Sequence, residues 1–200
     1  MKQLLLLMSA LWLLLLGGCA EPEPVVEQKA LYTQVNMWYI ERYTIQNLPE
    51  NSARLSMAKP LRAAHTVEST NYQRDTLIPV NSRIEIVATD SNTVFFKYNG
   101  NLIALSNIKK YSRLSLDALT QRMFGTAPVD LSKFTPEEQN ACLSGNVVPG
   151  MSKEAVLVAR GYPPAHKTPD LNANDWQYWN GRFNSRVYHF KEGKFVDFTD

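Results

Sequence analysis

The N-terminal leader constrains this chain most, because it must be assigned before any folded domain can be considered. One cation, Lys2, precedes a leucine-rich run over residues 4–16, and Gly17-Gly18-Cys19 follows it. This order of charge, short apolar run and small residues is typical of a secretory signal. A membrane-spanning helix would need about 20 apolar residues, and Glu21 and Glu23 close the run too early. The leader is therefore predicted to be a secretory signal and not a membrane-spanning helix.

The segment Leu16-Gly17-Gly18-Cys19 resembles the lipobox of bacterial lipoproteins. The resemblance implies that residues 1–18 are a signal peptide and that Cys19 is acylated, for example with palmitate, and begins the mature chain. At roughly 0.8 kcal/mol per buried methylene, two or three acyl chains suffice as an anchor. Lipoproteins kept in the inner membrane commonly carry aspartate after the cysteine, where this chain has Ala20. The resemblance therefore favours the periplasmic face of the outer membrane.

Charge and cysteine content exclude several classes of partner and of stabilisation. The formal net charge is +2 and no run of like charges occurs, so neither nucleic acid nor an anionic membrane surface is indicated as a partner. Cys142 is the only cysteine besides Cys19, so no intramolecular disulfide between free thiols is expected. Without residues 1–18 the 200-residue chain keeps 182 residues, enough for two small domains or one of medium size.

Residues 19–30 are predicted to be the lipidated cysteine and a tether, because residues 20–28 combine prolines with glutamates. Residues 31–112 are predicted to be mostly β. Over residues 31–45, Tyr, Trp, Ile and Thr favour a strand over a helix, and residues 47–60 are typical of a loop. Further short strands are predicted over residues 64–69, 77–80, 83–88, 94–98 and 102–105, from alternation and composition.

The dipeptide Asn99-Gly100 predicts a two-residue hairpin turn, because both residues tolerate positive φ angles. The stretch Asn-Tyr-Gln at residues 71–73, Leu-Ile-Pro-Val-Asn-Ser at 77–82 and Ile-Glu-Ile at 84–86 resembles SH3-type barrel domains of secreted bacterial proteins. That resemblance implies a small SH3-like β-barrel over residues 31–112.

Residues 113–133 are predicted to be a connecting helix and a linker. Leu116, Leu119 and Met123 form a helical stripe, and Gly125 is expected to end the helix.

The last third of the chain predicts two helices followed by three strands. Thr135-Pro136-Glu137-Glu138 is a capping box with proline at the first helical position, and Gly145 ends that helix. A second helix is expected from Ser152 to Gly161. Aromatic strands are then predicted over residues 176–179, 187–190 and 195–198.

Within residues 134–200, five short motifs together resemble the BamE (SmpA/OmlA) family of outer-membrane lipoproteins. They are Gly-Met-Ser-Lys-Glu-Ala-Val at 150–156, Gly-Tyr-Pro at 161–163, Trp-Gln-Tyr at 176–178, Tyr-His-Phe at 188–190 and Gly-Lys-Phe-Val at 193–196. The resemblance implies a domain of two helices packed on a three-stranded antiparallel sheet. Family members usually have leucine where this chain has Arg160. The predicted fold class is therefore α+β, an SH3-like barrel followed by a BamE-like domain.

No catalytic or metal-binding constellation is evident in the sequence. The three histidines, His65, His166 and His189, lack metal-ligand spacing and are interpreted as surface or structural residues. Cys142 lies between Ala141 and Leu143 with no adjoining cation, which is typical of a buried, unreactive thiol. No enzyme, cofactor or metal is therefore expected.

Candidate partner-binding residues lie around the first hairpin of the three aromatic strands. Alternation places Trp179 on the face opposite Trp176 and Tyr178, where it would either anchor a partner or pack on the neighbouring domain. Arg182 and Arg186 flank the hairpin and would form either a polar rim or ordinary surface.

These features lead to the hypothesis of a non-enzymatic, lipid-anchored periplasmic protein. It would act as a protein-binding accessory factor in outer-membrane or envelope assembly or maintenance, with the membrane, through Cys19, and an envelope protein as partners. The alternatives are peptidoglycan binding through the SH3-like domain and, by fold analogy, inhibition of a periplasmic enzyme.

Overall fold

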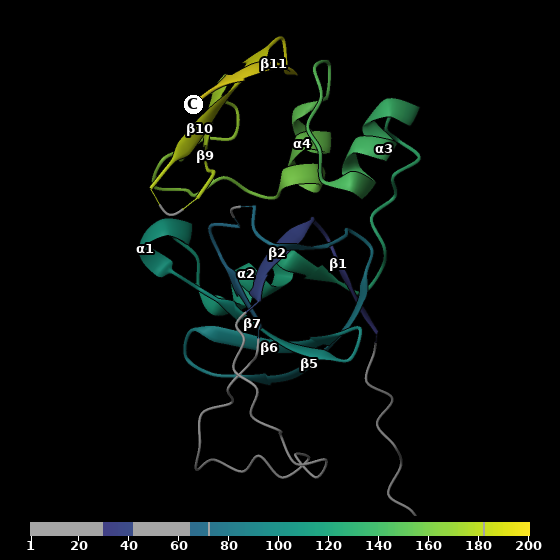
Figure 1. Ribbon diagram of the computed structural model, residues 1–200, viewed down its shortest axis with the longest axis vertical. Helices are drawn as coiled ribbons and strands as arrows, with labels where there is room; N and C mark the ends of the chain where they lie inside the picture. Colours follow the sequence, from purple (N-terminus) through teal and green to yellow (C-terminus); the bar gives the residue numbers. More distant parts are fainter. Residues whose placement is uncertain (1–29, 42–64, 72, 182) are drawn as a thin grey trace, which may run out of the picture.

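The computed structural model describes residues 30–41, 65–71, 73–181 and 183–200. Its larger part is a curled eight-stranded sheet with the strand order β4-β2-β3-β7-β6-β5-β1-β8 (Figure 1). All neighbouring strands are antiparallel except β3 and β7, which run parallel. The strands are β1 (Leu31–Thr33), β2 (Met37–Glu41), β3 (His65–Glu68), β4 (Thr76–Ile78), β5 (Arg83–Thr89), β6 (Thr93–Tyr98), β7 (Asn101–Ser106) and β8 (Phe124–Gly125).

Local sequence signals explain most of these strands. The Asn99-Gly100 turn joins β6 to β7 as predicted, because Tyr98 pairs directly with Asn101. Residues 31–41 form strands rather than a helix, also as predicted, and the rest of the expected strand up to residue 45 lies outside the described residues, as does the loop expected at 47–60. One apolar core fills the curl of the sheet, and its fully buried members are Met37, Val67, Ile78, Val94, Phe96, Ile103 and Leu105.

Helix α2 (Leu116–Met123) covers this core with Leu119 and Met123. The prediction that Gly125 caps this helix is wrong. Phe124 is already extended, and together with Gly125 it forms β8, which pairs with β1. A short helix, α1 (Lys109–Ser112), precedes α2.

A second sheet and two further helices make up the C-terminal part. The sheet has the order β11-β10-β9 and is antiparallel, with β9 (Asp175–Trp179), β10 (Ser185–Lys191) and β11 (Lys194–Thr199). Helix α3 (Pro136–Ser144) begins with the predicted capping box at Thr135, and α4 (Lys153–Arg160) is capped by Ser152. Both helices share one core cluster with the aromatic face of this sheet, namely Trp176, Tyr178, Tyr188, Phe190 and Phe195.

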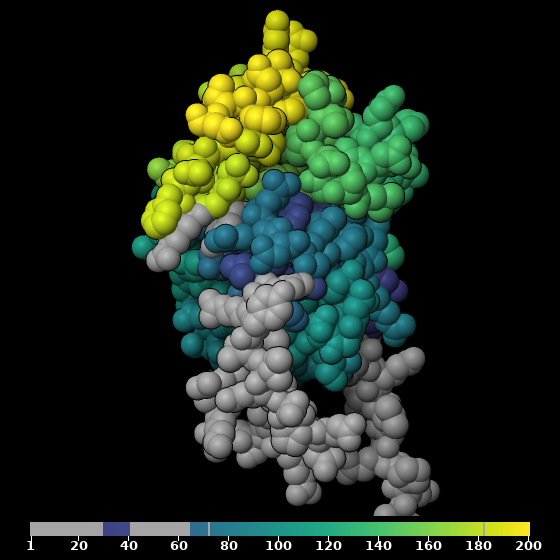
Figure 2. Space-filling model, in the orientation of Figure 1, coloured from purple at the N-terminus to yellow at the C-terminus, as the bar shows by residue number. Residues whose placement is uncertain are grey.

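The fold class predicted from the sequence is therefore wrong. The chain forms an eight-stranded curled sheet, a three-stranded sheet and four short helices, not a small SH3-like barrel followed by a BamE-like domain. Two findings explain the difference: β8 comes from the segment assigned to a connecting helix and linker, and Val80, from the expected barrel, belongs to the C-terminal core cluster. In Figure 2 the C-terminal residues sit as a cap on one end of the eight-stranded part.

Buried amide side chains join this cap to the eight-stranded sheet. Asn36, fully buried between β1 and β2, donates from Nδ2 to the carbonyl oxygens of Cys142 (2.6 Å) and Ala159 (2.8 Å). These carbonyls lie in the last turns of α3 and α4. Backbone carbonyls in the last turn of a helix have no hydrogen-bond donor within that helix. Asn36 Oδ1 accepts from the Val80 N–H at 2.6 Å, and Asn71 Nδ2 donates to the Asn36 carbonyl at 2.8 Å. The helix ends are thus capped by the neighbouring sheet.

Arg160, at the end of α4, completes the junction and is only 1% exposed. Its Nη1 donates to the Asn71 carbonyl at 2.6 Å, and its Nη2 donates to the Trp179 carbonyl at 3.0 Å. The guanidinium carbon lies 5.2 Å from the Trp38 ring centroid and 5.0 Å from that of Tyr178. Within the described ranges no carboxylate forms an ion pair with it, and burial lowers its pKa. Two carbonyls, two aromatic faces and the C-terminal end of a helix compensate this charge.

None of the helices in the described ranges combines the length and apolar character needed to cross a bilayer. The predicted acylation site, Cys19, lies outside the described residues.

Candidate partner-binding surface

Exposed large hydrophobic side chains concentrate in the C-terminal part. Of the six in the part of the chain that the structure describes, only Val87 belongs to the eight-stranded sheet. The other five are Leu143, Val148, Phe183, Val196 and Phe198. Exposed apolar side chains that gather in one region often mark an interaction site. The C-terminal part is therefore the candidate region for binding a partner.

Phe183 lies at the tip of the β9–β10 hairpin and is 84% exposed. The hairpin is closed by the Asn180 N–H, which donates to the Asn184 carbonyl at 2.9 Å. An open hollow of about 480 Å³ lies here, lined by Asn180, Phe183, Asn184, Ser185 and Asp200. One aromatic ring among amide, hydroxyl and carboxylate groups gives the hollow both apolar contact area and hydrogen-bonding capacity.

Arg186 borders this hollow through Asp200. Its Nε and Nη2 donate to the two Asp200 carboxylate oxygens at 2.5 and 3.0 Å, and its guanidinium carbon lies 3.9 Å from the Phe198 ring centroid. The bidentate contact raises the pKa of Arg186 and lowers that of Asp200. Phe198 is opposite Tyr188 in the register and 45% exposed. We call Phe183, Arg186, Phe198 and Asp200 the hairpin-end surface.

Trp179 lies on the other face of the sheet from Arg186, so the structure separates two predicted site residues. The burial pattern places Trp176 and Tyr178 inside and leaves Trp179 half-buried on the outer face. Its ring lies 6.2 Å from that of His166, which in turn lies 4.6 Å from Tyr111. Trp179 therefore lies beside His166 of the same C-terminal part and remains half-exposed. Its two expected roles, anchoring a partner or packing on the neighbouring domain, stay predictions. Arg182, the third predicted residue, lies outside the described residues.

His189 joins the strands of the smaller sheet on its outer face. Its Nδ1 lies 2.7 Å from Asp175 Oδ1 and its Nε2 lies 3.0 Å from Thr199 Oγ1. The order carboxylate, imidazole, hydroxyl matches that of a nucleophilic triad. However, these side chains stand on an exposed strand face and do not line the hollow beside Phe183. The row is interpreted as a cross-strand hydrogen-bond ladder.

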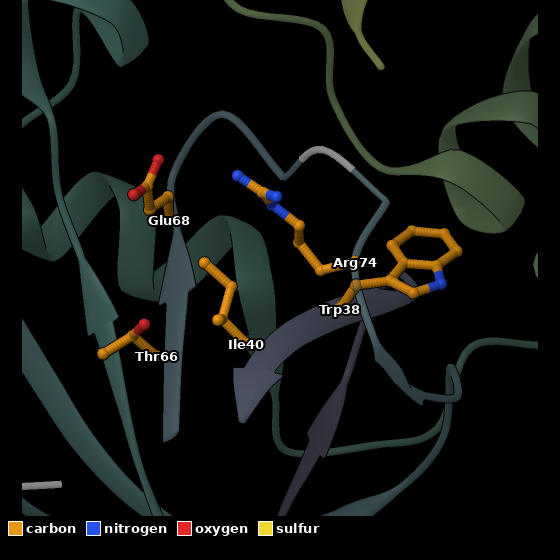
Figure 3. A pocket seen from close by; sticks show the side chains of 5 residues that line it. All are labelled: Trp38, Ile40, Thr66, Glu68 and Arg74. Atoms are coloured by element: carbon orange, nitrogen blue, oxygen red, sulfur yellow. The ribbon is translucent and has the colours of Figure 1, made fainter. Parts of the chain in front are cut away.

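A second concavity lies on the eight-stranded sheet and is lined by Trp38, Ile40, Thr66, Glu68 and Arg74 (Figure 3). Figure 3 shows the Arg74 guanidinium extending toward Glu68 above Ile40. The lining side chains leave no room for a water molecule. Among the described residues, this concavity therefore offers no space for a ligand.

Two further observations bear on chemistry. Cys142 is fully buried in α3, and burial, assisted by the nearby charge of Glu138, raises the pKa of its thiol to about 11. A thiol in this state keeps its proton at neutral pH and is a poor nucleophile. In the described ranges, no three His, Cys, Asp or Glu side chains are grouped as a metal site would require.

Phe183 was not among the surface residues predicted from the sequence. The available signal was an aromatic residue in the turn Gly-Arg-Phe-Asn-Ser at 181–185, between two predicted strands. Aromatic side chains in such polar turns have no strand face on which to be buried.

Comparison with protein-family models, with curated proteins and with solved structures finds no match for this chain. The resemblance of residues 134–200 to the BamE family thus stays a prediction from sequence.

Proposed function

We propose that this chain is a lipid-anchored binding protein of the bacterial envelope, acting as an accessory factor in outer-membrane or envelope assembly or maintenance. Its partner is a protein held at the hairpin-end surface. The leader ending in Cys19 supports the anchor. The observation that carries the binding role is the exposure of Phe183 and Phe198 on either side of the Arg186–Asp200 pair.

The chemistry of the hairpin-end surface fits a protein partner. Aromatic residues and arginine are enriched in protein interfaces and often carry most of their binding energy. Phe198 presents part of its ring to solvent while Arg186 stacks on the ring. The bidentate Asp200 contact holds that guanidinium in place, so little side-chain entropy is lost on binding.

The alternative of peptidoglycan binding depended on an SH3-like barrel. The eight-stranded sheet removes that support, and no observation in the described residues favours inhibition of an enzyme.

Site-specific photocrosslinking in a Gram-negative host tests the binding role. A photoreactive phenylalanine analogue is placed at position 183 or 198 of the full chain, with Val87 as the control because it is exposed on the other part of the molecule. We expect both test positions, but not the control, to capture the same envelope protein. Replacing Phe183 and Phe198 with serine should then abolish its co-purification, whereas Val87→Ser should not. Equal capture at position 87, or none at 183 and 198, would contradict the proposal.

The anchor is tested separately. Mass spectrometry of the membrane-extracted chain should show an acylated Cys19 at the N-terminus, and Cys19→Ser should release the protein from the membrane fraction. An unmodified wild-type Cys19 would refute anchoring without affecting the binding test.

A further inference from the structure

A second surface, distinct from the hairpin end, lies where α1 meets the chain around β9. Three rings form a row there: Tyr111 and His166 with centroids 4.6 Å apart, and His166 and Trp179 with centroids 6.2 Å apart. All three side chains are half-buried. The backbone N–H of His166 donates to the backbone carbonyl of Tyr111 at 3.3 Å. The row therefore presents ring edges and faces that are already held in position.

Cations surround this row of rings. Lys110 Nζ lies 4.7 Å from the Tyr111 ring centroid, and Lys110, Arg113 and Lys167 are all exposed. Burial lowers the pKa of His166, and these three charges lower it further. We call Lys110, Tyr111, Arg113, His166, Lys167 and Trp179 the junction surface.

The junction surface is built from two parts of the chain that the buried network holds together. Tyr111 belongs to α1 of the eight-stranded part, whereas Trp179 belongs to β9 of the cap. Arg160 Nη2 binds the Trp179 carbonyl while its Nη1 binds the Asn71 carbonyl. The rings are therefore held in position by contacts within the chain, which reduces the entropy lost on association.

We propose that the junction surface binds an acidic segment of a protein partner, separately from the hairpin-end surface. Carboxylates of the segment pair with Lys110, Arg113 and Lys167, while its apolar groups contact the rings of Tyr111 and Trp179. The charge is complementary to an acidic segment, and aromatic residues beside arginine are typical of protein interfaces.

The geometry favours a protein over other polyanions. Membrane-surface patches typically use clusters of 4–8 Lys or Arg residues, more than the three here. Single-stranded nucleic acid is usually bound along a basic groove that follows the backbone, and neither concavity described above involves these residues.

Fluorescence anisotropy with a labelled glutamate-rich peptide tests the proposal, using the full chain in a neutral detergent and a glutamine-rich peptide of the same length as the neutral probe. The test variant carries Lys110→Glu, Arg113→Glu and Lys167→Glu. The control variant carries Arg83→Glu, Lys97→Glu and Lys191→Glu, three exposed cations elsewhere, so both variants change the net charge equally. Circular dichroism establishes that both are folded.

We expect the acidic peptide to bind the wild-type chain in a salt-dependent manner and the test variant to bind at least about tenfold more weakly. The control variant should change the dissociation constant by less than about threefold. Trp179→Phe should bind nearly as well as wild type, and Trp179→Ala more weakly at unchanged salt dependence, because only the alanine removes ring contact.

Three results would overturn the proposal: equal weakening by both triple variants, binding of the glutamine-rich peptide as strong as that of the acidic one, or no binding of the acidic peptide at low salt. Tighter binding of a single-stranded oligonucleotide or of phosphatidylserine-containing nanodiscs, lost in the test variant alone, would assign the surface to another class of ligand and also overturn it. Because the hairpin-end residues are untouched, these outcomes are independent of the crosslinking test.

Discussion

Replacing Asn36 with alanine should destabilise the chain more than any exposed substitution. The alanine leaves three buried groups without their partner: the Cys142 and Ala159 carbonyls and the Val80 N–H. Each buried unsatisfied group costs about 1–3 kcal/mol. Because neighbouring groups relax, we expect a total loss of about 3–5 kcal/mol in the free energy of unfolding. For a chain of this size each kcal/mol lowers Tm by about 2–4 °C, so Tm should fall by about 10 °C.

Asn36→Asp keeps a hydrogen-bond acceptor at this position but removes the Nδ2 donor, so the two contributions can be measured separately. Aspartate can still accept from the Val80 N–H, but it turns a carboxylate oxygen toward the two helix carbonyls. We expect it to cost more than alanine, since a buried charge then faces two acceptors. Urea denaturation followed by tryptophan fluorescence measures both variants against Asn140→Ala, an exposed change on α3 that should stay within about 0.5 kcal/mol of wild type. A loss below about 1 kcal/mol for Asn36→Ala, or an aspartate variant more stable than the alanine, would refute the reasoning.

Three further predictions concern the buried contacts between the C-terminal part and the eight-stranded sheet, and the buried thiol of Cys142. Gly161→Ala should destabilise the chain much more than Gly193→Ala, because both have positive φ but only at Gly161 would a Cβ atom lie 2.0 Å from Asn71 Nδ2; equal shifts in Tm would contradict this. Arg160→Leu should lower Tm despite removing a buried charge, because it leaves the Asn71 carbonyl without its guanidinium donor; an unchanged or higher Tm would show that desolvation dominates. The folded chain should keep the Cys142 proton between about pH 9 and 11 while the unfolded chain loses it, so the free energy of unfolding should fall as pH rises through that range. Cys142→Ala should show a smaller fall in urea denaturation, because burial also raises the pKa of Tyr178 and that residue still contributes; an equal fall in both proteins would contradict this.

Local features of the fold were predictable because they depend on neighbouring residues. The Asn99-Gly100 turn, the Thr135 capping box and the alternating aromatic strands each carry their own signal within a few residues, and the structure confirms all three. The assembly of the larger sheet was not predictable in this way. Pairing of β1 with β5 and β8, and of β3 with β7 in parallel, brings together residues far apart in sequence, and periodicity says nothing about such partners.

The candidate site was only partly predictable for a similar reason. Strand alternation placed Trp179 on the outer face of its strand, but it could not show that α1 would supply a ring for the row next to it. Phe183 had no periodic neighbours to identify it, since it stands in a turn. Side chains that act at a surface are therefore found from the sequence only when a regular element positions them.

Arg160, which stands where the family that residues 134–200 were predicted to resemble usually has leucine, is explained by its contacts in this fold. A leucine at that position would pack among Trp38 and Tyr178 but would donate no hydrogen bond to Asn71 or Trp179. The guanidinium can do both, because its planar face suits aromatic rings and its edge carries five donors. Its burial would oppose folding unless those partners were already in place. The arginine therefore fits only a chain in which the eight-stranded sheet, α4 and β9 meet at one point, and that meeting holds the rings of the junction surface in position.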